Sequence, residues 1–195
     1  MKIFLSGIGM LLYCFICFGQ QKGIFVDPRD GKHYKTIMVE GQTWFAENLA
    51  YKTDSGCWAY DNNMKNVPVY GYLYTYQSAK AGCPTGWHLS FMDDWNQLID
   101  HFGGDSLAGN KLRSARGWDS VQHRGNNRSG FSALPGGFRY LPEGFSNDGF
   151  IGYWWCADPD GNAAYYITIY NENGEIDRSR YDVGYGLSVR CIRDN

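Results

Sequence analysis

The stretch Gly82–Phe102 constrains this chain more than any other, because it combines a cysteine, a turn and an amphipathic helix. Ser90 and Asp93 have the S-x-x-D spacing of a capping box, in which side chains satisfy the first free backbone N–H groups of a helix. The next turns place four apolar side chains on one helical face: Trp95, Leu98, Ile99 and Phe102. The glycine pair that follows predicts the end of the helix. This stretch is therefore expected to build core.

Turn residues divide the rest of the chain into short predicted strands. The clearest are a hairpin over residues 34–45, which turns at Glu40-Gly41, and a strand at 165–170 followed by the Asn171–Gly174 turn. Further strands are predicted at residues 70–74, 131–139, 151–157 and 187–192, the 131–139 segment with a strand at each end of a Pro-Gly-Gly turn. Thr75 is expected to cap a short helix through Ala81. Residues 105–114 predict a second helix, and residues 115–129 a surface loop.

The N-terminus has the pattern of a secretory signal peptide over residues 1–19. A lysine is followed by the apolar run Ile8–Phe18, which is too short to span a bilayer, and small residues precede the expected cleavage site before Gln20. Residues 20–26 form a short lead-in, and residues 27–195 form one domain. We expect a secreted or cell-surface protein with no membrane span after cleavage. A lipid anchor on Cys14 or Cys17 remains an alternative.

Charge and composition narrow the class of protein. The net charge is −2, from 18 basic and 20 acidic residues without a basic stripe. A nucleic-acid partner is therefore not expected, because neutralising phosphates needs clustered Lys and Arg. The chain has 15 Tyr, 11 Phe, 7 Trp and 25 Gly. An aromatic, glycine-rich chain of this kind is typical of a compact α+β domain with long loops.

Four of the six cysteines lie after the signal peptide: Cys57, Cys83, Cys156 and Cys191. In an exported protein an even number predicts two disulfides, for which three pairings are possible. A bridge between Cys83 and Cys191 would tie the helical half to the last strand. Closing a loop of about 100 residues stabilises a fold by up to roughly 4–5 kcal/mol in the chain-entropy model. The mature chain has no C-x-x-C spacing, so we do not expect a zinc site.

No catalytic or metal-binding motif stands out. The four histidines, His33, His88, His101 and His123, are scattered and have no H-x-x-H spacing. The run Gly104–Lys111 lacks the lysine of a phosphate-binding loop, and no G-x-S-x-G turn is present. Asp158–Asn162 hints at calcium but reads better as a turn. We therefore predict no enzyme, no catalytic residue and no resident metal. Calcium remains possible in the loops 115–129 and 144–149.

Aromatic residues in loops are the best candidates for ligand contact. Trp44, Trp87, Trp95, Trp154 and Trp155 are expected mostly in the core. Trp and Tyr rings beside polar residues suit recognition of sugars or protein surfaces, because flat rings offer contact area at little entropic cost. The tentative binding residues lie in or beside loops, with contact surface expected at 117–127 and 141–149: Trp58, Tyr60, Trp118, Asn126, Tyr140 and Tyr153.

Several separate motifs resemble one known family. They are the run from Asp27 (DPRDGKHYKTIMVEGQTWFAENL), Tyr70–Trp87, the G-F-S-A-L-P-G-G pattern at Gly130–Gly137, the run GYWW at Gly152–Trp155 and the ending Gly186–Asp194. In this order they resemble the Fibrobacter succinogenes major paralogous domain, which is found on exported bacterial proteins, some of them lipoproteins. The resemblance implies a C-type-lectin-like fold, similar to that of formylglycine-generating enzymes. It implies no established biochemical role.

Two departures from the family pattern concern cysteines. Cys156 stands where the family commonly has serine after Tyr-Trp-Trp, and Asn66–Val69 occupies the place where the partner of the loop cysteine often lies. We therefore hypothesise that Cys156 pairs with Cys57. Formylglycine-generating chemistry needs a redox-active cysteine pair, and structural bridges explain these cysteines more simply.

The expected fold is an α+β, C-type-lectin-like single domain with two short helices, mainly antiparallel strands, long loops and disulfide staples. The expected function is an exported recognition or adhesion module that binds a polysaccharide or a surface protein. A purely structural cell-surface domain is the alternative, and an enzyme on the formylglycine-generating scaffold is less favoured.

Overall fold

The computed structural model describes residues 21–142 and 144–194. The predicted signal peptide, its cleavage site before Gln20 and the cysteines Cys14 and Cys17 lie outside the described residues. No helix in the described part of the chain is long and apolar enough to cross a membrane.

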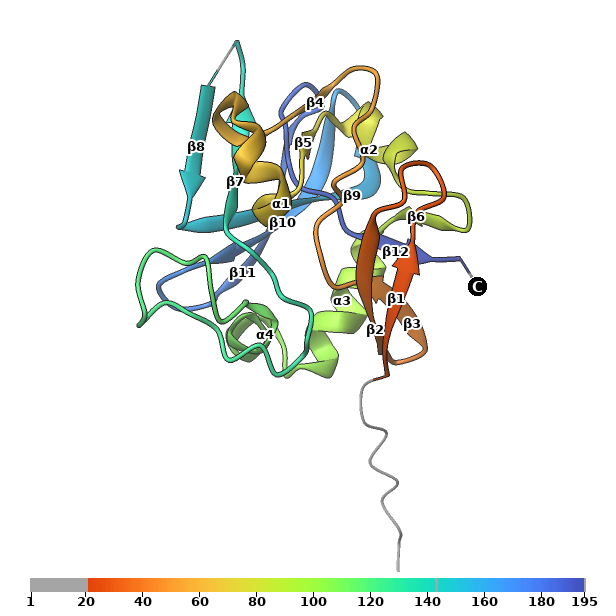
Figure 1. Cartoon of the computed structure of the whole chain (residues 1–195). Coiled ribbons are helices and arrows are strands. Elements are labelled where there is room, and N and C mark those ends of the chain that lie inside the picture. The colour runs from red at the N-terminus through yellow and green to blue at the C-terminus, as the bar shows by residue number, and fades with distance from the viewer. Residues whose placement is uncertain (1–20, 143, 195) are drawn as a thin grey trace, which may run out of the picture.

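The first sheet brings the two ends of the described chain together (Figure 1). Its strand order is β1-β2-β3-β12-β6, and every pairing is antiparallel. The strands are β1 (Lys22–Val26), β2 (His33–Val39), β3 (Gln42–Phe45), β6 (Trp87–Leu89) and β12 (Cys191–Arg193). Glu40 and Gly41 have φ of 49° and 79°, the backbone that a tight hairpin turn needs. The predicted hairpin is confirmed.

The second sheet has the order β11-β10-β9-β7-β8, in which only β7 and β9 run parallel. A separate small sheet pairs β4 with β5. The strands are β4 (Cys57–Trp58), β5 (Leu73–Tyr74), β7 (Gly136–Tyr140), β8 (Gly144–Asp148), β9 (Ile151–Asp160), β10 (Ala163–Tyr170) and β11 (Ile176–Asp182). The predicted strand at 165–170 and its turn at Asn171–Gly174 are confirmed.

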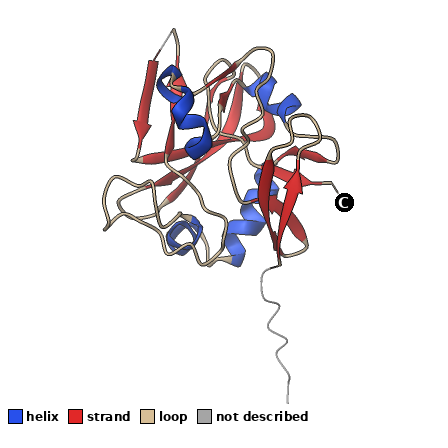
Figure 2. Ribbon diagram, viewed as in Figure 1, coloured by secondary structure: helices blue, strands red, loops and turns tan. Residues whose placement is uncertain are grey.

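Four α-helices lie in the described residues, so the expected number of two is too low (Figure 2). They are α1 (Val67–Tyr70), α2 (Tyr76–Gly82), α3 (Met92–His101) and α4 (Asp105–Leu112), and two 3₁₀ turns, η1 (Tyr60–Asn62) and η2 (Met64–Asn66), precede α1. The Thr75 hydroxyl caps α2 by accepting from the Ser78 N–H at 3.3 Å. The predicted Thr75 cap is confirmed.

The cap of α3 differs from the sequence prediction. Ser90 and Asp93 do not form the capping box. The Phe91 N–H donates to the Asp94 carboxylate at 2.7 Å, and the Met92 N–H donates to Asp158 at 2.6 Å. Ser90 stays extended because its backbone joins two neighbours: its N–H donates to the Arg190 carbonyl and its own carbonyl accepts from the Ala157 N–H. The helix therefore begins at Met92.

Two hydrophobic clusters fill the interior. One contains the predicted α3 face, whose four apolar side chains are all buried. There Trp44, Trp95 and Phe131 pack edge to face, with ring centroids 5.2, 5.4 and 5.6 Å apart. The other cluster includes Tyr76 and Ala79 of α2, Tyr74 of β5 and Cys191 of β12. Edge-to-face packing is a preferred arrangement of buried rings, so these contacts fix the core geometry.

Two further segments differ from expectation. Gly136 and Gly137 lie within β7 and not in a hairpin turn, and residues 131–135 contribute only the bridge between Arg113 and Ala133. The predicted last strand at 187–192 is regular only over Cys191–Arg193, preceded by single bridges at Leu187 and Ser188. In the irregular segment before β7, the Ala133 N–H donates to the Leu112 carbonyl and the Ala133 carbonyl accepts from the Ser114 N–H.

Candidate functional site

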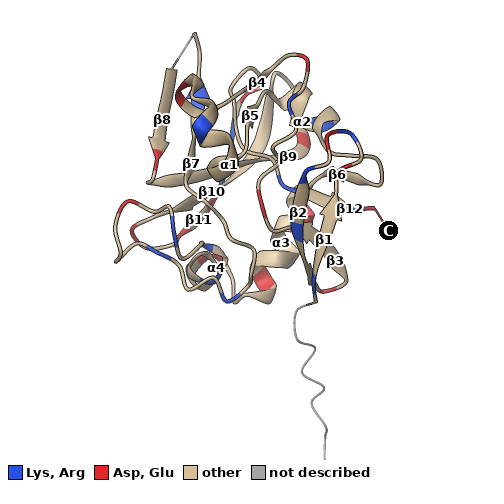
Figure 3. Cartoon of the chain, viewed as in Figure 1, with Lys and Arg blue, Asp and Glu red and all other residues tan. Residues whose placement is uncertain are grey.

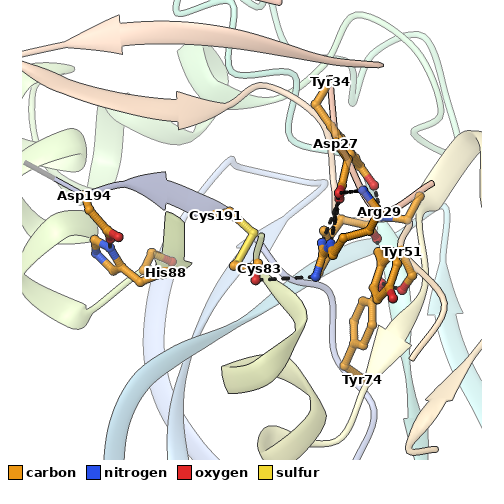
Figure 4. Close-up of a disulfide and its surroundings, with 12 residues drawn as sticks. Asp27, Arg29, Tyr34, Tyr51, Tyr74, Cys83, His88, Cys191 and Asp194 are labelled. Atoms are coloured by element: carbon orange, nitrogen blue, oxygen red, sulfur yellow. Dashed lines mark hydrogen bonds and ion pairs between the residues drawn. A yellow bond between two sulfur atoms is a disulfide. The ribbon is translucent and has the colours of Figure 1, made fainter. Parts of the chain in front are cut away.

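The disulfide between Cys83 and Cys191 is present and joins the end of α2 to β12 (Figure 4). It closes a sequence separation of 108 residues. Arg29 supports the bridge from outside: its guanidinium forms an ion pair with buried Asp27 at 2.7 Å and donates to the Cys83 carbonyl at 3.5 Å. The predicted bridge is therefore confirmed, and it belongs to the scaffold.

The proposed second bridge is wrong. Cys57 and Cys156 are both free, the first half-buried and the second fully buried. Cys156 belongs to the cluster around α3, whereas Cys57 packs against the other cluster. Burial raises the pKa of the Cys156 thiol well above its usual value, which keeps it protonated and unreactive.

The six predicted binding residues do not form one exposed surface in the structure. Tyr60, Trp118 and Tyr153 are buried, with 4%, 4% and 5% exposure. Trp58 is half-buried beneath the Arg139 guanidinium, which lies 3.9 Å from its ring centroid. Only Asn126 and Tyr140 are exposed. Three of the six therefore have little surface to offer a ligand, because backbone that looks like loop in sequence folds inward here.

Several of the chain's tyrosines form an aromatic stack on the second sheet, made of Phe138, Tyr153, Tyr166, Tyr181 and Tyr185. Tyr181 lies between Tyr166 and Tyr185, with centroids 4.5 and 4.8 Å away and interplanar angles of 21° and 17°. Phe138 also stacks on Tyr181 at 5.6 Å. Tyr181 is covered by its stacked neighbours, and Tyr153 and Tyr166 are buried. A sugar stacks on ring faces, so the aromatic stack is scaffold.

Burial in the aromatic stack also shifts the acidity of its phenols. Desolvation raises the pKa of Tyr153 to about 12, against the opposing hydrogen bond from the Asn147 amide. Desolvation likewise raises the pKa of Tyr166 and of Tyr181. These groups remain neutral throughout the physiological range.

A cleft of about 650 Å³ opens between β2, α1 and the segments 114–117 and 127–134. This volume is within the roughly 300–1,000 Å³ of typical ligand sites. Three basic side chains and one carboxylate line it, Lys32, Lys35, Arg116 and Glu47. Figure 3 shows basic residues both on β2 and along the loop that follows α4. The cleft is thus positive on a chain whose net charge is −2.

The three basic groups of the cleft differ in how far they are already paired. Lys32 donates to the Ala50 carbonyl and lies 3.1 Å from Asp30. Lys35 pairs with Glu47 at 3.2 Å. Arg116 is exposed, and its guanidinium makes no hydrogen bond or ion pair with the described residues. It is therefore the group best placed to receive an anion.

Asn127 and Ser132 fix one wall of the cleft in an unusual backbone conformation. Their φ angles are 48° and 55°, a left-handed region that non-glycine residues rarely adopt. The Asn127 side chain locks the pair, donating to the Ser132 hydroxyl at 2.9 Å and accepting from the Ser132 N–H at 2.9 Å. Such conformations persist only where the surroundings enforce them, and they concentrate at functional sites.

Arg190 supports the floor of the cleft from inside the protein. It is fully buried and donates to four acceptors, without a carboxylate: Asn48 Oδ1 and the carbonyls of Phe45, Phe131 and Ser132. Desolvation lowers its pKa to about 9, so it is still charged at neutral pH. Asn48 and Ser132 line the cleft, and Arg190 therefore sets their positions.

The sequence profile of the Fibrobacter succinogenes major domain matches residues 37–193. The chain belongs to this family. No curated protein and no solved structure matched the chain. The expected family is thus confirmed over residues 37–193, although the family description names no function.

Two further sequence runs of this Fibrobacter major domain, at Gly104–Lys111 and Asp158–Asn162, form ordinary secondary structure. The Gly104–Lys111 run is the start and body of α4, and the turn within Asp158–Asn162 is confined to its last two residues. Asp160 pairs with Arg180, and Asp158 caps α3. No group of three or more His, Cys, Asp or Glu converges among residues 21–142 and 144–194. The possibility of loop calcium stays a prediction.

Sequence reasoning missed most of the cleft. Lys35 lies in the predicted hairpin at 34–45, and Lys32 lies just before it. Arg116 lies in the predicted surface loop at 115–129, next to the expected contact surface at 117–127. Nothing in the sequence indicated that these segments meet. Asn127 and Ser132 form one wall of the cleft. Their left-handed backbone is visible only in the structure.

Proposed function

We propose that this chain is an exported recognition module that binds a carboxylate-bearing polysaccharide in the basic cleft, and that it is not an enzyme. The observation that carries the proposal is the exposed Arg116, without a partner among the described residues, in a cleft lined by two further basic side chains. An unpaired guanidinium binds carboxylates with paired hydrogen bonds, so an acidic sugar is a better ligand than a neutral one.

The remaining lining of the cleft suits a sugar. Ser114, Ser132 and Asn127 supply hydroxyl and amide groups, while Val67, Val69 and Leu134 supply apolar surface. This mixture of a few polar groups and apolar walls is typical of ligand sites. The cleft is large enough for a short segment of a polymer and has no aromatic platform at its mouth.

Export and fold belong to the same proposal. The signal-peptide pattern of residues 1–19 supports export, and so does the bridge between Cys83 and Cys191, since disulfides persist in oxidising compartments. The meeting of the terminal strands in one sheet, with helices and long loops on its flanks, supports the C-type-lectin-like fold that the family resemblance implies.

The experiment compares two forms of one ligand. Affinity is measured by calorimetry for an oligomer of uronic acid and for the same oligomer with its carboxylates methyl-esterified, with and without a calcium chelator. We expect saturable binding of the free acid, weakened by salt, and at least about tenfold weaker binding of the ester, because esterification removes the charge that the cleft receives. Equal affinity for both forms would contradict the proposal. Binding of neither would favour a structural role.

A further inference from the structure

A groove of about 370 Å³ crosses the first sheet (Figure 1), and we call it the threonine groove. Each of the five strands contributes to its lining: Phe25 of β1, Thr36 of β2, Thr43 of β3, Arg193 of β12 and Trp87 of β6. Within the described part of the chain, the threonine groove and the basic cleft share no lining residue. The volume is within the roughly 300–1,000 Å³ of typical ligand sites.

The strand register brings the charged and hydroxyl groups of the groove to one face of the sheet. Arg193 pairs with Trp87 in the ladder between β12 and β6. Ile192 pairs with Trp44, so Thr43 is the neighbour of Arg193 on the other side. Residues directly opposite each other have Cβ atoms roughly 4.5–5.5 Å apart. The side chains of Thr43, Arg193 and Trp87 therefore form a row on the face opposite Trp44, which packs against α3.

The polar groups of the groove lack partners among the described residues. The hydroxyls of Thr36, Thr43 and Thr85 make no hydrogen bond there, and the exposed Arg193 guanidinium makes no hydrogen bond or ion pair. Thr36 is only 8% exposed, and a side chain buried to this degree normally has its polar atom paired. Gly23 pairs with Thr36, and a Cβ at Gly23 would lie 2.8 Å from the Thr36 hydroxyl oxygen. The glycine therefore leaves this hydroxyl uncovered.

Aromatic rings line another part of the threonine groove. The rings of Phe25, Phe45 and Trp87 contact one another, with centroids 4.4, 5.1 and 5.6 Å apart. Phe45 is fully buried, whereas Phe25 and Trp87 are half-buried and line the groove beside the hydroxyls. A sugar ring combines an apolar face with a rim of hydroxyls. It therefore matches a lining of aromatic surface and unpaired hydroxyls better than a purely apolar ligand does.

We propose that the threonine groove binds a sugar unit that carries one sulfate or phosphate ester. The ester contacts Arg193, because a guanidinium forms paired hydrogen bonds with such oxyanions. With three terminal oxygens, the ester also accepts from the neighbouring Thr43 hydroxyl. The sugar hydroxyls exchange hydrogen bonds with Thr36 and Thr85, and the ring lies against Trp87. The groove is separate from the basic cleft, so this proposal does not depend on the ligand proposed for the cleft.

The test records backbone amide NMR spectra of the oxidised chain without its predicted signal peptide, in separate titrations with glucose 6-sulfate, glucose 6-phosphate and glucose. We expect saturable shifts at Thr43, Gly86 and Arg193 with at least one ester. Glucose should bind about tenfold or more weakly, because it lacks the charged hydrogen-bonding group. The ester that binds more tightly identifies the preferred oxyanion. No uronic acid is used, so the result does not depend on the proposal for the cleft.

Two substitutions locate the site. Arg193→Gln removes the charge and should weaken ester binding by about tenfold or more. Gly23→Ala fills the space beside the Thr36 hydroxyl and should also weaken binding. The matched control Arg124→Gln removes an exposed arginine outside the groove and should bind as the wild type does. The amide spectrum of each variant without ligand shows whether it is folded, and only folded variants are compared.

Five results would overturn the proposal. The first three are the absence of saturable shifts at millimolar concentrations of either ester, equal affinity for glucose, and ester binding that Arg193→Gln leaves unchanged. Shifts confined to cleft residues such as Lys35 and Arg116 would overturn it because they would place the esters in the basic cleft. Equal weakening by Arg124→Gln would overturn it because it would indicate unspecific attraction of anions.

Discussion

The aromatic stack and the basic cleft use their side chains in opposite ways. In the stack, Tyr181 contacts Tyr166 and Tyr185 through both of its ring faces. In the cleft, Tyr34 is buried against Phe45, while the guanidinium of Arg116 has no partner among the described residues. Binding capacity therefore follows from which groups lack a partner inside the fold, and an abundance of aromatic residues is a poor guide to it.

The largest effect is expected at Arg190. Arg190→Met leaves the buried carbonyls of Phe45, Phe131 and Ser132 without a donor, and should lower the free energy of unfolding by about 3 kcal/mol or more. Arg139→Met is the matched control, because that buried arginine donates to only one carbonyl among the described residues; the substitution should cost about 1 kcal/mol. Urea unfolding measures both. Equal losses would mean that Arg190 does not hold the floor of the cleft.

The aromatic stack should contribute to stability and not to binding. Tyr181→Ala removes the central ring and should cost about 2 kcal/mol in urea unfolding. Tyr140→Ala, at the exposed end of β7, should change stability by no more than about 0.5 kcal/mol. Affinity for the uronic acid oligomer should stay the same in both. Loss of that affinity in Tyr181→Ala, with the fold retained, would assign recognition to the stack.

At alkaline pH, the aromatic stack and the arginine beneath the cleft should affect stability in opposite directions. Burial raises the pKa of Tyr153 to about 12, while a tyrosine in the unfolded chain ionises near pH 10. Between these values the folded chain binds more protons than the unfolded chain. The contribution of the Tyr153 phenol to stability is therefore complete below pH 10 and is lost as the pH rises toward 12.

The pH experiment compares urea midpoints of wild type and Tyr153→Phe at pH 8 and pH 11. The difference between the two proteins isolates this phenol from Arg190, whose lowered pKa has the opposite effect on stability above pH 9. We expect the wild type to lose more stability than Tyr153→Phe. Equal losses would contradict the burial of this phenol.

The smallest expected effect lies at the mouth of the cleft. Arg116→Ala should weaken binding of the uronic acid oligomer by about 1–2 kcal/mol, because one charged hydrogen-bonding group is removed. Arg124→Ala removes an exposed arginine from the same loop outside the cleft lining and is the matched control. Calorimetry at low salt measures both. Equal effects of the two substitutions would mean that Arg116 contributes only its positive charge and makes no specific contact with the ligand.

Local patterns predicted much of the fold. The α3 stripe, the hairpin at Glu40-Gly41 and the turn at Asn171–Gly174 follow from periodicity and turn chemistry, which act over a few residues. The Cys83–Cys191 bridge was proposed because it ties the helical half of the chain to the last strand, and the structure contains it. The α3 cap was missed because its second carboxylate, Asp158, comes from β9, which is 66 residues away in sequence.

The candidate site was less predictable, for a physical reason. Trp118 and Tyr153 were assigned to the surface because they stand in or near loops, yet both are buried. The cleft depends on the meeting of β2, α1 and the 114–117 segment, and no local pattern encodes that meeting. The pairing of Cys57 with Cys156 failed likewise, because each thiol belongs to a different cluster.

The central claim is that the cleft, and not the aromatic stack, receives the ligand. Backbone amide NMR during titration with the uronic acid oligomer tests it most directly. We predict that the signals of Lys35, Arg116 and Asn127 shift saturably while those of Phe138 and Tyr181 stay in place. Shifts confined to Phe138, Tyr181 and Tyr185, with the cleft residues unchanged, would contradict the account.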